Sequence, residues 1–393
     1  MDIFKKCIKA TEYESGLKEK GHYFFFRKLE SPQDSEVVVN GKRVIMIGSN
    51  NYLGLSSHPR VKKAAVSAIE KFGSGCSGSR FLNGNLAIHE ELETKLARFC
   101  RKEAAVVFAT GYQTNLGAIS ALVDRNDAVI IDRYDHASII DGCRLSFGKA
   151  QKFHHNDMND LERALNETRE KAQLIVVDGV YSMEGDIADL PAIVKLAKAY
   201  GARVMVDDAH AIGVLGNGGR GTAEHFGLEN DVDLIMGTFS KSLAAVGGFI
   251  AGSSEVVNWI KHIGRSLMFS ASLPPPQVAS VSAALDIIEE QPELRTSLWK
   301  NSQKMLNGFK ALGYDTGTSE TPIIPVIIKD TIKTFQMCKL LFEKGVFVNP
   351  VVSPAVPPGR ELLRTSYMAT HTDEQLNNVL AAFETVGREL GVI

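Results

Sequence analysis

From about residue 86, the chain alternates helical segments with short runs of apolar and β-branched residues. Each run is too apolar to leave either face in water, which is typical of strands in a parallel sheet covered by helices on both sides. The expected strands cover residues 104–108, 128–131, 174–177, 203–206, 234–236 and 249–251. This pattern predicts an α/β domain.

The N-terminal part carries a different pattern. Residues 1 to about 30 predict a charged helix ending in the aromatic cluster 23–26. This cluster either packs against the rest of the chain or lines an apolar substrate entrance or a subunit interface. Asn40-Gly41 lies between two apolar runs and predicts a β-hairpin. A further helix is expected at about 59–72.

Toward the C-terminus, a long helical region at about 275–312 leads into a smaller α+β pattern. Its expected strands are 323–328 and 346–349, and its expected helices are 331–344 and 373–390. We therefore divide the chain into an N-terminal helix and hairpin segment (1–57), a large domain (58–280) and a small C-terminal domain (281–393).

Composition narrows the classes of function. The net charge of −2 over 393 residues gives no overall positive potential that would attract nucleic acid, so we expect no nucleic-acid partner. The hydrophobic content of 44% suffices for a large core. No apolar run approaches the ~20 residues needed to cross a bilayer, and no signal core is visible. Five scattered cysteines match neither a zinc site nor a disulfide framework. We expect a cytoplasmic protein, at most peripheral at the inner membrane face.

Polar side chains follow five of the expected strands. These clusters lie at residues 111–115, 135–138, 181–186, 207–210 and 240–241. The carboxyl ends of parallel strands meet at one edge of an open α/β sheet, where ligands bind. The sequence therefore predicts that the five clusters converge on one pocket.

Lys241 is the centre of that expected pocket. Most lysines stay exposed, but one fixed at a dry strand end can keep a neutral amine and bond to an aldehyde. Asp207, at a buried strand end, needs a cationic partner, and a protonated pyridine nitrogen would serve. His210 can hydrogen-bond the phenolic oxygen of such a ring, and His136 can stack on its face. Together these residues favour pyridoxal phosphate (PLP).

The phosphate of that cofactor needs donors of its own. Gly111 and Tyr112, at an expected helix start, can offer backbone N–H groups. Thr238 and Ser240, beside the lysine, can offer hydroxyls. The phosphate seat is therefore expected next to the lysine turn.

Three other patterns suggest different roles. The run 216–221 satisfies G-x-G-x-x-G, but a dinucleotide site needs the immediate turn from strand to helix, which this run does not occupy. His154 and His155 beside Asp157 suggest a metal, yet adjacent strand residues point to opposite faces, so a surface or packing role is favoured and no metal is expected. The glycine-rich segment 73–80 either approaches a ligand closely or is a flexible loop.

Six motifs spread over nearly the whole chain occur in an order and spacing that mark a family. They are Ser-Asn-Asn-Tyr-Leu-Gly at 49–54, Asp-His-Ala-Ser at 135–138, Ser-Met-Glu-Gly-Asp at 182–186, Asp-Asp-Ala-His at 207–210, Gly-Thr-Phe-Ser-Lys at 237–241 and Leu-Arg at 363–364. The chain thereby resembles the α-oxoamine synthase family of fold-type I PLP enzymes. The resemblance implies a mostly parallel seven-stranded sheet in the large domain, a smaller α+β C-terminal domain, and a homodimer with active sites at the subunit interface.

The resemblance also implies roles for single residues. Lys241 would hold the cofactor and act as base, Asp207 would pair with the ring nitrogen, and His136 would stack on the ring and polarise an acyl carbonyl. Ser182 and His210 would lie near the ring oxygen. The residues implied for the phosphate are Gly111, Tyr112, Thr238 and Ser240, with Ser270 and the backbone of Ala271 reaching across from the partner. Those implied around the amino-acid substrate are Asn50, Ser79 and Arg364.

The same resemblance implies a decarboxylative condensation of an amino acid with an acyl thioester. Segments 79–84, 347–357 and 368–372 are most similar to members that join L-serine to palmitoyl-CoA, giving 3-ketodihydrosphingosine in the first step of sphingolipid synthesis. Other members use glycine with acetyl-CoA or alanine with a pimeloyl thioester. Some relatives are non-catalytic subunits without the lysine, and the presence of Lys241 argues against that class. Some bacterial members carry arginine where this chain has Val352, so the grip on the substrate carboxylate stays open, as do acyl-chain length and acyl carrier.

Overall fold

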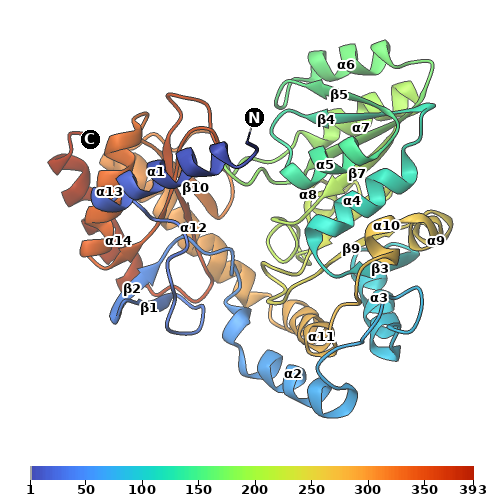
Figure 1. The fold of residues 1–393 in the computed structure, drawn as a ribbon, viewed down its shortest axis with the longest axis horizontal. Helices are drawn as coiled ribbons and strands as arrows, with labels where there is room; N and C mark the ends of the chain where they lie inside the picture. The colour runs from blue at the N-terminus through green and yellow to red at the C-terminus, as the bar shows by residue number, and fades with distance from the viewer. Residues whose placement is uncertain (1) are drawn as a thin grey trace. The chain divides into compact units, whose positions relative to one another are not determined.

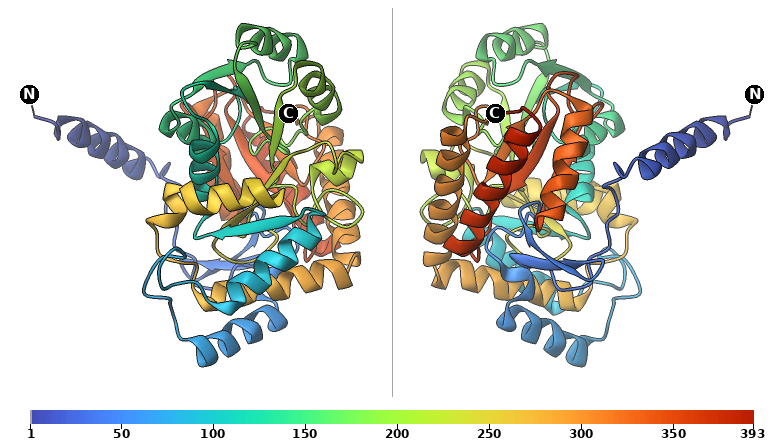
Figure 2. Two further views of the ribbon diagram at one scale, coloured as in Figure 1. Left: turned by 90° about the vertical axis from the view of Figure 1, so that its right-hand side faces the viewer. Right: turned by 90° about the vertical axis from the view of Figure 1, so that its left-hand side faces the viewer.

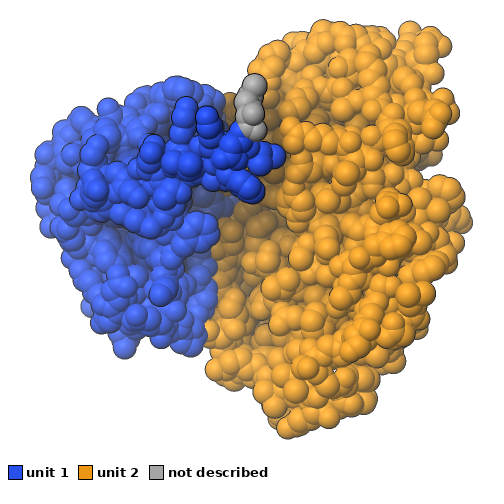
Figure 3. All heavy atoms as spheres, in the orientation of Figure 1, with its two compact units in different colours: residues 1–49, 299–393 blue, residues 50–298 orange. Residues whose placement is uncertain are grey.

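The computed structural model describes residues 2–393 and divides them into two compact units (Figures 1 and 3). Unit 2 is Asn50–Leu298, and unit 1 combines the N-terminal residues up to Ser49 with Trp299–Ile393. The expected boundaries at 57/58 and 280/281 differ from this division. The N-terminal hairpin pairs with a C-terminal strand, so it belongs to unit 1 and forms no segment of its own.

A seven-stranded sheet forms the centre of unit 2, with the order β3-β9-β8-β7-β6-β4-β5. The strands are β3 (Ala104–Phe108), β4 (Asp127–Asp132), β5 (Lys149–Phe153), β6 (Ala172–Asp178), β7 (Arg203–Asp207), β8 (Leu234–Thr238) and β9 (Gly248–Gly252). β9 runs antiparallel to β3 and β8, and the pairs from β8 to β5 are parallel. The mostly parallel seven-stranded α/β sheet is thereby confirmed.

β5 is the strand of this sheet that the apolar pattern did not reveal. It pairs with β4 at the sheet edge, and among its five residues Phe153 alone is buried. An edge strand with one solvated face lacks the continuous apolar run of a central parallel strand. β5 ends immediately before His154 and His155.

The helices of unit 2 are α2 (Pro59–Phe72), α3 (Ala87–Phe99), α4 (Gly111–Leu122), α5 (Ala137–Leu145), α6 (Met158–Glu167), α7 (Leu190–Tyr200), α8 (Thr222–Phe226), α9 (Ser254–Ile263), α10 (Arg265–Met268) and α11 (Pro275–Glu290). Buried side chains of α4, α5, α9 and α10 form one apolar core with those of the sheet. α11 packs against α2 and α3. Since α4 and α5 begin directly after β3 and β4, their first turns lie at the carboxyl edge of the sheet, where the predicted site is located.

Unit 1 contains two three-stranded sheets, β1-β2-β11 and β10-β13-β12. The strands are β1 (Glu36–Val39), β2 (Lys42–Met46), β10 (Ile323–Ile327), β11 (Val346–Phe347), β12 (Asn349–Val351) and β13 (Leu362–Ser366), and the helices are α1 (Lys5–Glu19), α13 (Thr331–Glu343) and α14 (Asp373–Glu389). α12 (Glu293–Leu312) leads into this unit. Asn40 and Gly41 take φ values of +51° and +71°, as a tight hairpin turn between β1 and β2 requires.

Unit 1 differs from the sequence pattern in several details. The expected strand 346–349 is divided between β11 and β12, which belong to different sheets. The N-terminal helix ends at Glu19, buries none of its residues and projects from the rest of unit 1 (Figure 2). Phe24 of the aromatic cluster packs with Phe335, at 6.1 Å between ring centroids, whereas Phe26 is exposed. β13 was not predicted, because the charge of Arg364 interrupts its short apolar run.

Candidate active site

Lys241 lies in the loop between β8 and β9, which backbone hydrogen bonds hold in one shape. The N–H of Phe239 donates to the carbonyl of Gly247 at 2.9 Å, and the N–H of Ala245 donates to that of Phe239 at 2.9 Å. Ala244 takes a φ of +60°, a left-handed conformation that is strained for a residue with a Cβ. The half-buried lysine is therefore held on a fixed turn at the carboxyl end of β8.

Asp207 ends β7 and is 3% exposed. The Asn115 amide Nδ2 donates to Asp207 Oδ2 at 2.7 Å, and the Ala209 N–H donates to Asp207 Oδ1 at 3.0 Å. Both donors are neutral, so they orient the buried carboxylate without neutralising it, which suits a cationic ring nitrogen as the further partner. Asn115 lies in the expected polar cluster 111–115 but was assigned no role from the sequence, and the structure shows it fully buried on α4.

Asp208, the next residue, is directed elsewhere. Its carboxylate accepts hydrogen bonds from the Thr222 N–H at 3.0 Å and the Thr222 hydroxyl at 2.6 Å. Burial raises the pKa of Asp208 to about 7. Asp208 thus anchors the start of α8, and Asp207 alone of this pair belongs to the site.

His136 is the N-cap residue of α5, and its contacts define where its proton lies. Its backbone N–H donates to Asp178 Oδ2 at 3.1 Å. The Ser138 N–H donates to His136 Nδ1 at 3.3 Å, and the Ser138 hydroxyl lies 2.7 Å from the same nitrogen while accepting Asn115 Nδ2 at 2.8 Å. Because Nδ1 accepts, the neutral imidazole carries its proton on Nε2.

The three side chains predicted at the centre of the pocket lie close enough to affect one another's charge. Burial lowers the pKa of His136, Asp207 opposes this change, and Lys241 adds to it. His136 is therefore neutral at pH 7. The loops after β4, β7 and β8 bring these three residues to one place at the carboxyl edge of the sheet.

His210 follows β7 and is almost fully buried. Its Nδ1 lies 2.7 Å from the hydroxyl of Tyr52, and that hydroxyl lies 3.4 Å from Asn50 Oδ1. Asn50, predicted near the substrate, thus lies beside Tyr52 and His210. Tyr52 is a further buried residue that the sequence reasoning did not assign. Ser182 is half-buried in the loop between β6 and α7.

The first turn of α4 and the end of β8 form a seat for an anion. Thr110 caps α4, so the following N–H groups point outward from a helix N-terminus. The Thr238 hydroxyl lies 3.0 Å from that of Ser240. A Cβ on Gly111 would lie 2.6 Å from Thr238 Oγ1, and one on Gly248 would lie 2.6 Å from the Gly111 Cα. Backbone N–H groups and two hydroxyls in so close a cradle fit a phosphate.

Tyr112 and Ser270 lie around this seat. The Tyr112 ring meets the His136 ring edge-on at 6.4 Å between centroids, and its hydroxyl donates to Asp141. Gln113 Nε2 donates to Ser270 Oγ at 3.2 Å, which in turn donates to the Ala271 carbonyl at 3.3 Å. These contacts are within one chain, and the expected reach of Ser270 and Ala271 to a partner's phosphate stays a prediction.

The remaining predicted substrate residues differ in their surroundings. Ser79 has a buried hydroxyl that lacks a hydrogen-bond partner among residues 2–393. Its neighbour Arg80 forms a buried ion pair with Glu93 at 2.7 Å and so has a structural role. Arg364 is 7% exposed and belongs to β13 of unit 1, with Val352 following β12. The roles of Ser79 and Arg364 toward a substrate stay predictions.

The run 216–221 does not form a dinucleotide site. It precedes the short α8, and the N–H groups of Gly218 and Arg220 both donate to Glu224 Oε2, so the backbone donors that a pyrophosphate would need are already bound.

Across residues 2–393 we find no cluster of three His, Cys, Asp or Glu side chains arranged for a metal ion. None of the helices in that range combines the length and apolarity that crossing a bilayer requires.

The family model for aminotransferase class I and II matches residues 42–383 of the chain. A serine palmitoyltransferase from Sphingobacterium spiritivorum is 54% identical over 365 residues, covering 93% of this chain and 92% of that protein. One from Bacteroides thetaiotaomicron is 50% identical, with 97% of both proteins covered. An 8-amino-7-oxononanoate synthase from Thermoanaerobacter pseudethanolicus is 49% identical, with 96% of both covered.

Solved structures agree with these sequence relatives. A high-resolution structure of serine palmitoyltransferase with PLP has a TM-score of 0.97 and 39% identity, with both chains covered completely. The serine palmitoyltransferase of Sphingomonas wittichii has the same TM-score, identity and coverage. The similarity therefore extends over both units of the chain.

Proposed function

The chain belongs to the aminotransferase class I and II family, and within it to the α-oxoamine synthases; from this premise we propose that it condenses L-serine with palmitoyl-CoA. The products are 3-ketodihydrosphingosine, coenzyme A and carbon dioxide, so the protein is a PLP-dependent acyltransferase. The choice of serine and a long acyl chain rests on the 54% identity to a serine palmitoyltransferase over 93% of the chain. The site is compatible with any α-oxoamine synthase.

The single observation that supports PLP chemistry is the arrangement around Asp207. This buried carboxylate has neutral hydrogen-bond donors, and His136 and Lys241 lie close enough to feel one another's charge. The cradle of Gly111 and Thr238 fits the phosphate. When bound, the protonated ring of PLP accepts the electron pair that remains at the substrate Cα.

The side chains of unit 2 divide the remaining work. Asp207, oriented by Asn115, would keep the proton on the ring nitrogen by its opposite charge. Lys241 Nζ would hold the cofactor aldehyde and, once released by the substrate amine, move the proton at Cα. His136 is neutral with its proton on Nε2, so it can donate a hydrogen bond to the thioester carbonyl as negative charge develops there.

We also propose that the protein is a homodimer. Large apolar side chains are exposed on the loops and helix ends of unit 2, among them Phe81, Leu82, Tyr112, Val246 and Phe269. A subunit contact would cover exposed apolar side chains of this kind. A cytoplasmic location and peripheral contact with the inner membrane face stay predictions.

The experiment offers purified holoenzyme L-serine, glycine or L-alanine, each with palmitoyl-, acetyl- or pimeloyl-CoA, and identifies the aminoketone by mass. We expect the C18 aminoketone from L-serine and palmitoyl-CoA as the dominant product. A dominant product from alanine and pimeloyl-CoA would instead make the protein an 8-amino-7-oxononanoate synthase, the second candidate that the 49% identical relative favours.

Lys241→Ala tests the assignment of the lysine. The variant should lose both turnover and the visible absorption band of lysine-bound PLP, because no other group at the turn can bond to the aldehyde. Lys310→Ala, an exposed position on α12, is the matched control and should keep both. A Lys241→Ala protein that condenses serine at the wild-type rate would disprove the role.

A further inference from the structure

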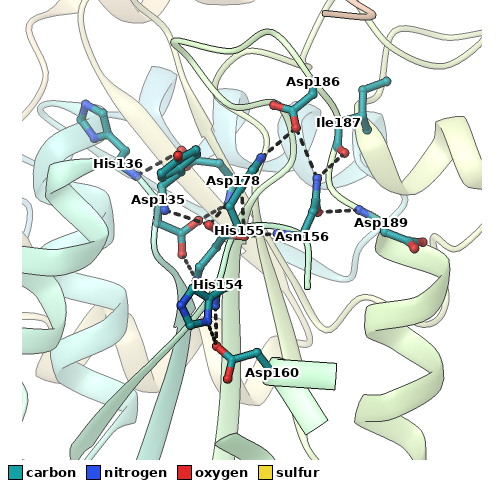
Figure 4. Close-up of polar contacts among 12 residues, drawn as sticks. Asp135, His136, His154, His155, Asn156, Asp160, Asp178, Asp186, Ile187 and Asp189 are labelled. Carbon is teal, nitrogen blue, oxygen red and sulfur yellow. Dashed lines mark hydrogen bonds and ion pairs between the residues drawn. The ribbon is translucent and has the colours of Figure 1, made fainter. Parts of the chain in front are cut away.

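The adjacent histidines that follow β5 have opposite surroundings (Figure 4). His154 has a side chain that is 57% exposed and is paired with Asp160 at the start of α6. His155 is 19% exposed and points into unit 2, where it lies between the carboxylates of Asp132 and Asp186. The pair therefore combines a mostly exposed side chain with one that is mostly covered.

His155 uses both ring nitrogens toward carboxylates. Nδ1 lies 3.1 Å from Asp132 Oδ1 and Nε2 lies 2.8 Å from Asp186 Oδ2. Tyr134 stacks on the imidazole at 4.5 Å between centroids, and Tyr181 meets it edge-on at 4.4 Å. A neutral imidazole has only one N–H, so donating to two ionised carboxylates requires the doubly protonated ring. Burial opposes this charge, but hydrogen bonds and charge from the two aspartates outweigh it and raise the pKa of His155 to about 9.

Asp132 is an ionised acceptor in this arrangement. Its Oδ1 accepts the N–H of Tyr134 at 2.8 Å, and its Oδ2 accepts the N–H of Asn156 at 3.0 Å. Backbone donors to both oxygens stabilise the ionised form of this carboxylate. The positive charge of the ion pair therefore resides on His155.

Asp132 also begins a chain of hydrogen bonds that ends at His136. The Asp132 N–H donates to Asp135 Oδ2 at 2.8 Å, and Asp135 Oδ1 accepts the N–H of Asp178 at 2.8 Å. Asp178 Oδ2 accepts the backbone N–H of His136 at 3.1 Å. The loop that carries His136 is thus tied at its base to the backbone of Asp132, the residue whose carboxylate contacts His155.

Asp186 fixes the second loop, which carries Ser182. The Asp186 carbonyl accepts the N–H of Tyr181 at 3.1 Å, closing the loop around Ser182. Asn156, next to His155, donates from Nδ2 to Asp186 Oδ2 at 3.3 Å and to the Ile187 carbonyl at 3.2 Å. The loop between β6 and α7 is therefore attached to His155 and Asn156, which follow β5.

We propose that His155 is a positioning residue: as an imidazolium between Asp132 and Asp186 it locks together the loops that place His136 and Ser182 against PLP. The inference rests on the proposed function only in that PLP occupies the site, whichever amino acid reacts. Losing the charge would leave two buried carboxylates near each other without a counter-ion, so both loops would shift. The titratable groups that face His155 are Asp132 at the end of β4, Tyr134 after it, and Tyr181 and Asp186 after β6, with Asp135 and Asp178 behind them.

A direct test follows the His155 ring in the wild-type holoenzyme by nitrogen NMR with labelled histidine. His155→Gln and His154→Gln assign the two signals. We expect both His155 ring nitrogens to be protonated at pH 7.5 and to titrate near pH 9. A His155 ring that is neutral at pH 7.5 would overturn the proposal without reference to any substrate.

A second test measures cofactor release and turnover in the two holoenzyme variants. His155→Gln should raise the PLP dissociation constant about tenfold and lower kcat by roughly tenfold to a hundredfold, because small displacements of reacting groups have such effects. His154→Gln should match the wild type. Wild-type PLP affinity should fall between pH 8 and 10, and this fall should be absent in His155→Gln.

A purely structural role would give a different result: lower thermal stability with unchanged PLP affinity and an unchanged pH profile, which would refute the proposal. If His155→Gln does not fold, Asp186→Asn keeps the side-chain size and removes one carboxylate charge. That variant should lower the pKa of His155 and weaken PLP binding. An unchanged pKa of His155 would contradict the proposal. A protein that passes these tests but yields no aminoketone from serine would refute the proposed function and leave the role of His155 intact.

Discussion

The charge on His155 predicts a pH-dependent contribution to folding stability. The pKa of His155 is about 9 in the folded protein and near 6.5 for an ordinary histidine. Because the folded value is the higher one, the contribution is fully present below about pH 6.5 and is lost as pH rises through 9. A difference of about 2.5 units at about 1.36 kcal/mol per unit corresponds to about 3 kcal/mol.

The assay compares the free energy of unfolding of wild type and His155→Gln from pH 5.5 to 10, with excess PLP throughout. Other buried acids, such as Asp208 with its pKa near 7, also titrate in this range but are common to both proteins and cancel in the difference. The wild-type advantage should be constant up to about pH 6.5 and decline by about 3 kcal/mol by pH 9.5. With an unfolding entropy of about 2.1 cal/mol/K per residue, that decline lowers Tm by about 4 °C.

The reasoning fails if the difference between wild type and His155→Gln is independent of pH. It also fails if His154→Gln shows the same pH dependence, because the side chain of His154 is mostly exposed and pairs with one carboxylate, that of Asp160. Either result would mean that the imidazolium does not stabilise the folded state.

Two further substitutions test the cofactor site. Asp207→Asn should keep bound PLP but slow exchange of the serine Cα proton by roughly a hundredfold or more, since the opposite charge that keeps the ring nitrogen protonated is removed. NMR in deuterated water measures the rate of this exchange, and exchange at the wild-type rate would contradict the prediction. Gly111→Ala places a Cβ 2.6 Å from Thr238 Oγ1, and this overpacking should raise the PLP dissociation constant by about tenfold to a hundredfold in an absorbance titration. Gly16→Ala, with open space around the added methyl group on α1, is its control and should bind PLP normally.

Much of the large domain could be predicted from local patterns. Runs such as 174–177 are buried on both faces, and burial of this kind selects apolar, β-branched residues over several consecutive positions. The polar clusters after these runs were expected to converge, because parallel strands end at one edge of the sheet. The structure brings Lys241, Asp207 and His136 together as that rule requires. The edge strand β5 and the charged strand β13 lack such runs, and only backbone pairing reveals them.

The contacts that orient the site residues could not be predicted in this way. Asn115 holds Asp207 across 92 residues of sequence, and Tyr52 meets His210 across 158. Neither pair leaves a local signal, since an asparagine or tyrosine looks the same in sequence whether its partner is water or a buried carboxylate. The sequence therefore identified the chemical groups of the site and left their orientation open.

The histidine pair after β5 shows this division within two residues. The sequence pattern predicted that His154 and His155 point to opposite faces as neighbours in a strand. The structure ends β5 at Phe153 and places His155 in the turn that follows. Only the tertiary structure decided that His155 meets Asp132 and Asp186, 23 and 31 residues away, while His154 stays at the surface. The physical reason is that charge and pKa depend on burial and on the groups brought close by folding, whereas strand and helix patterns depend on the order of residues along the chain.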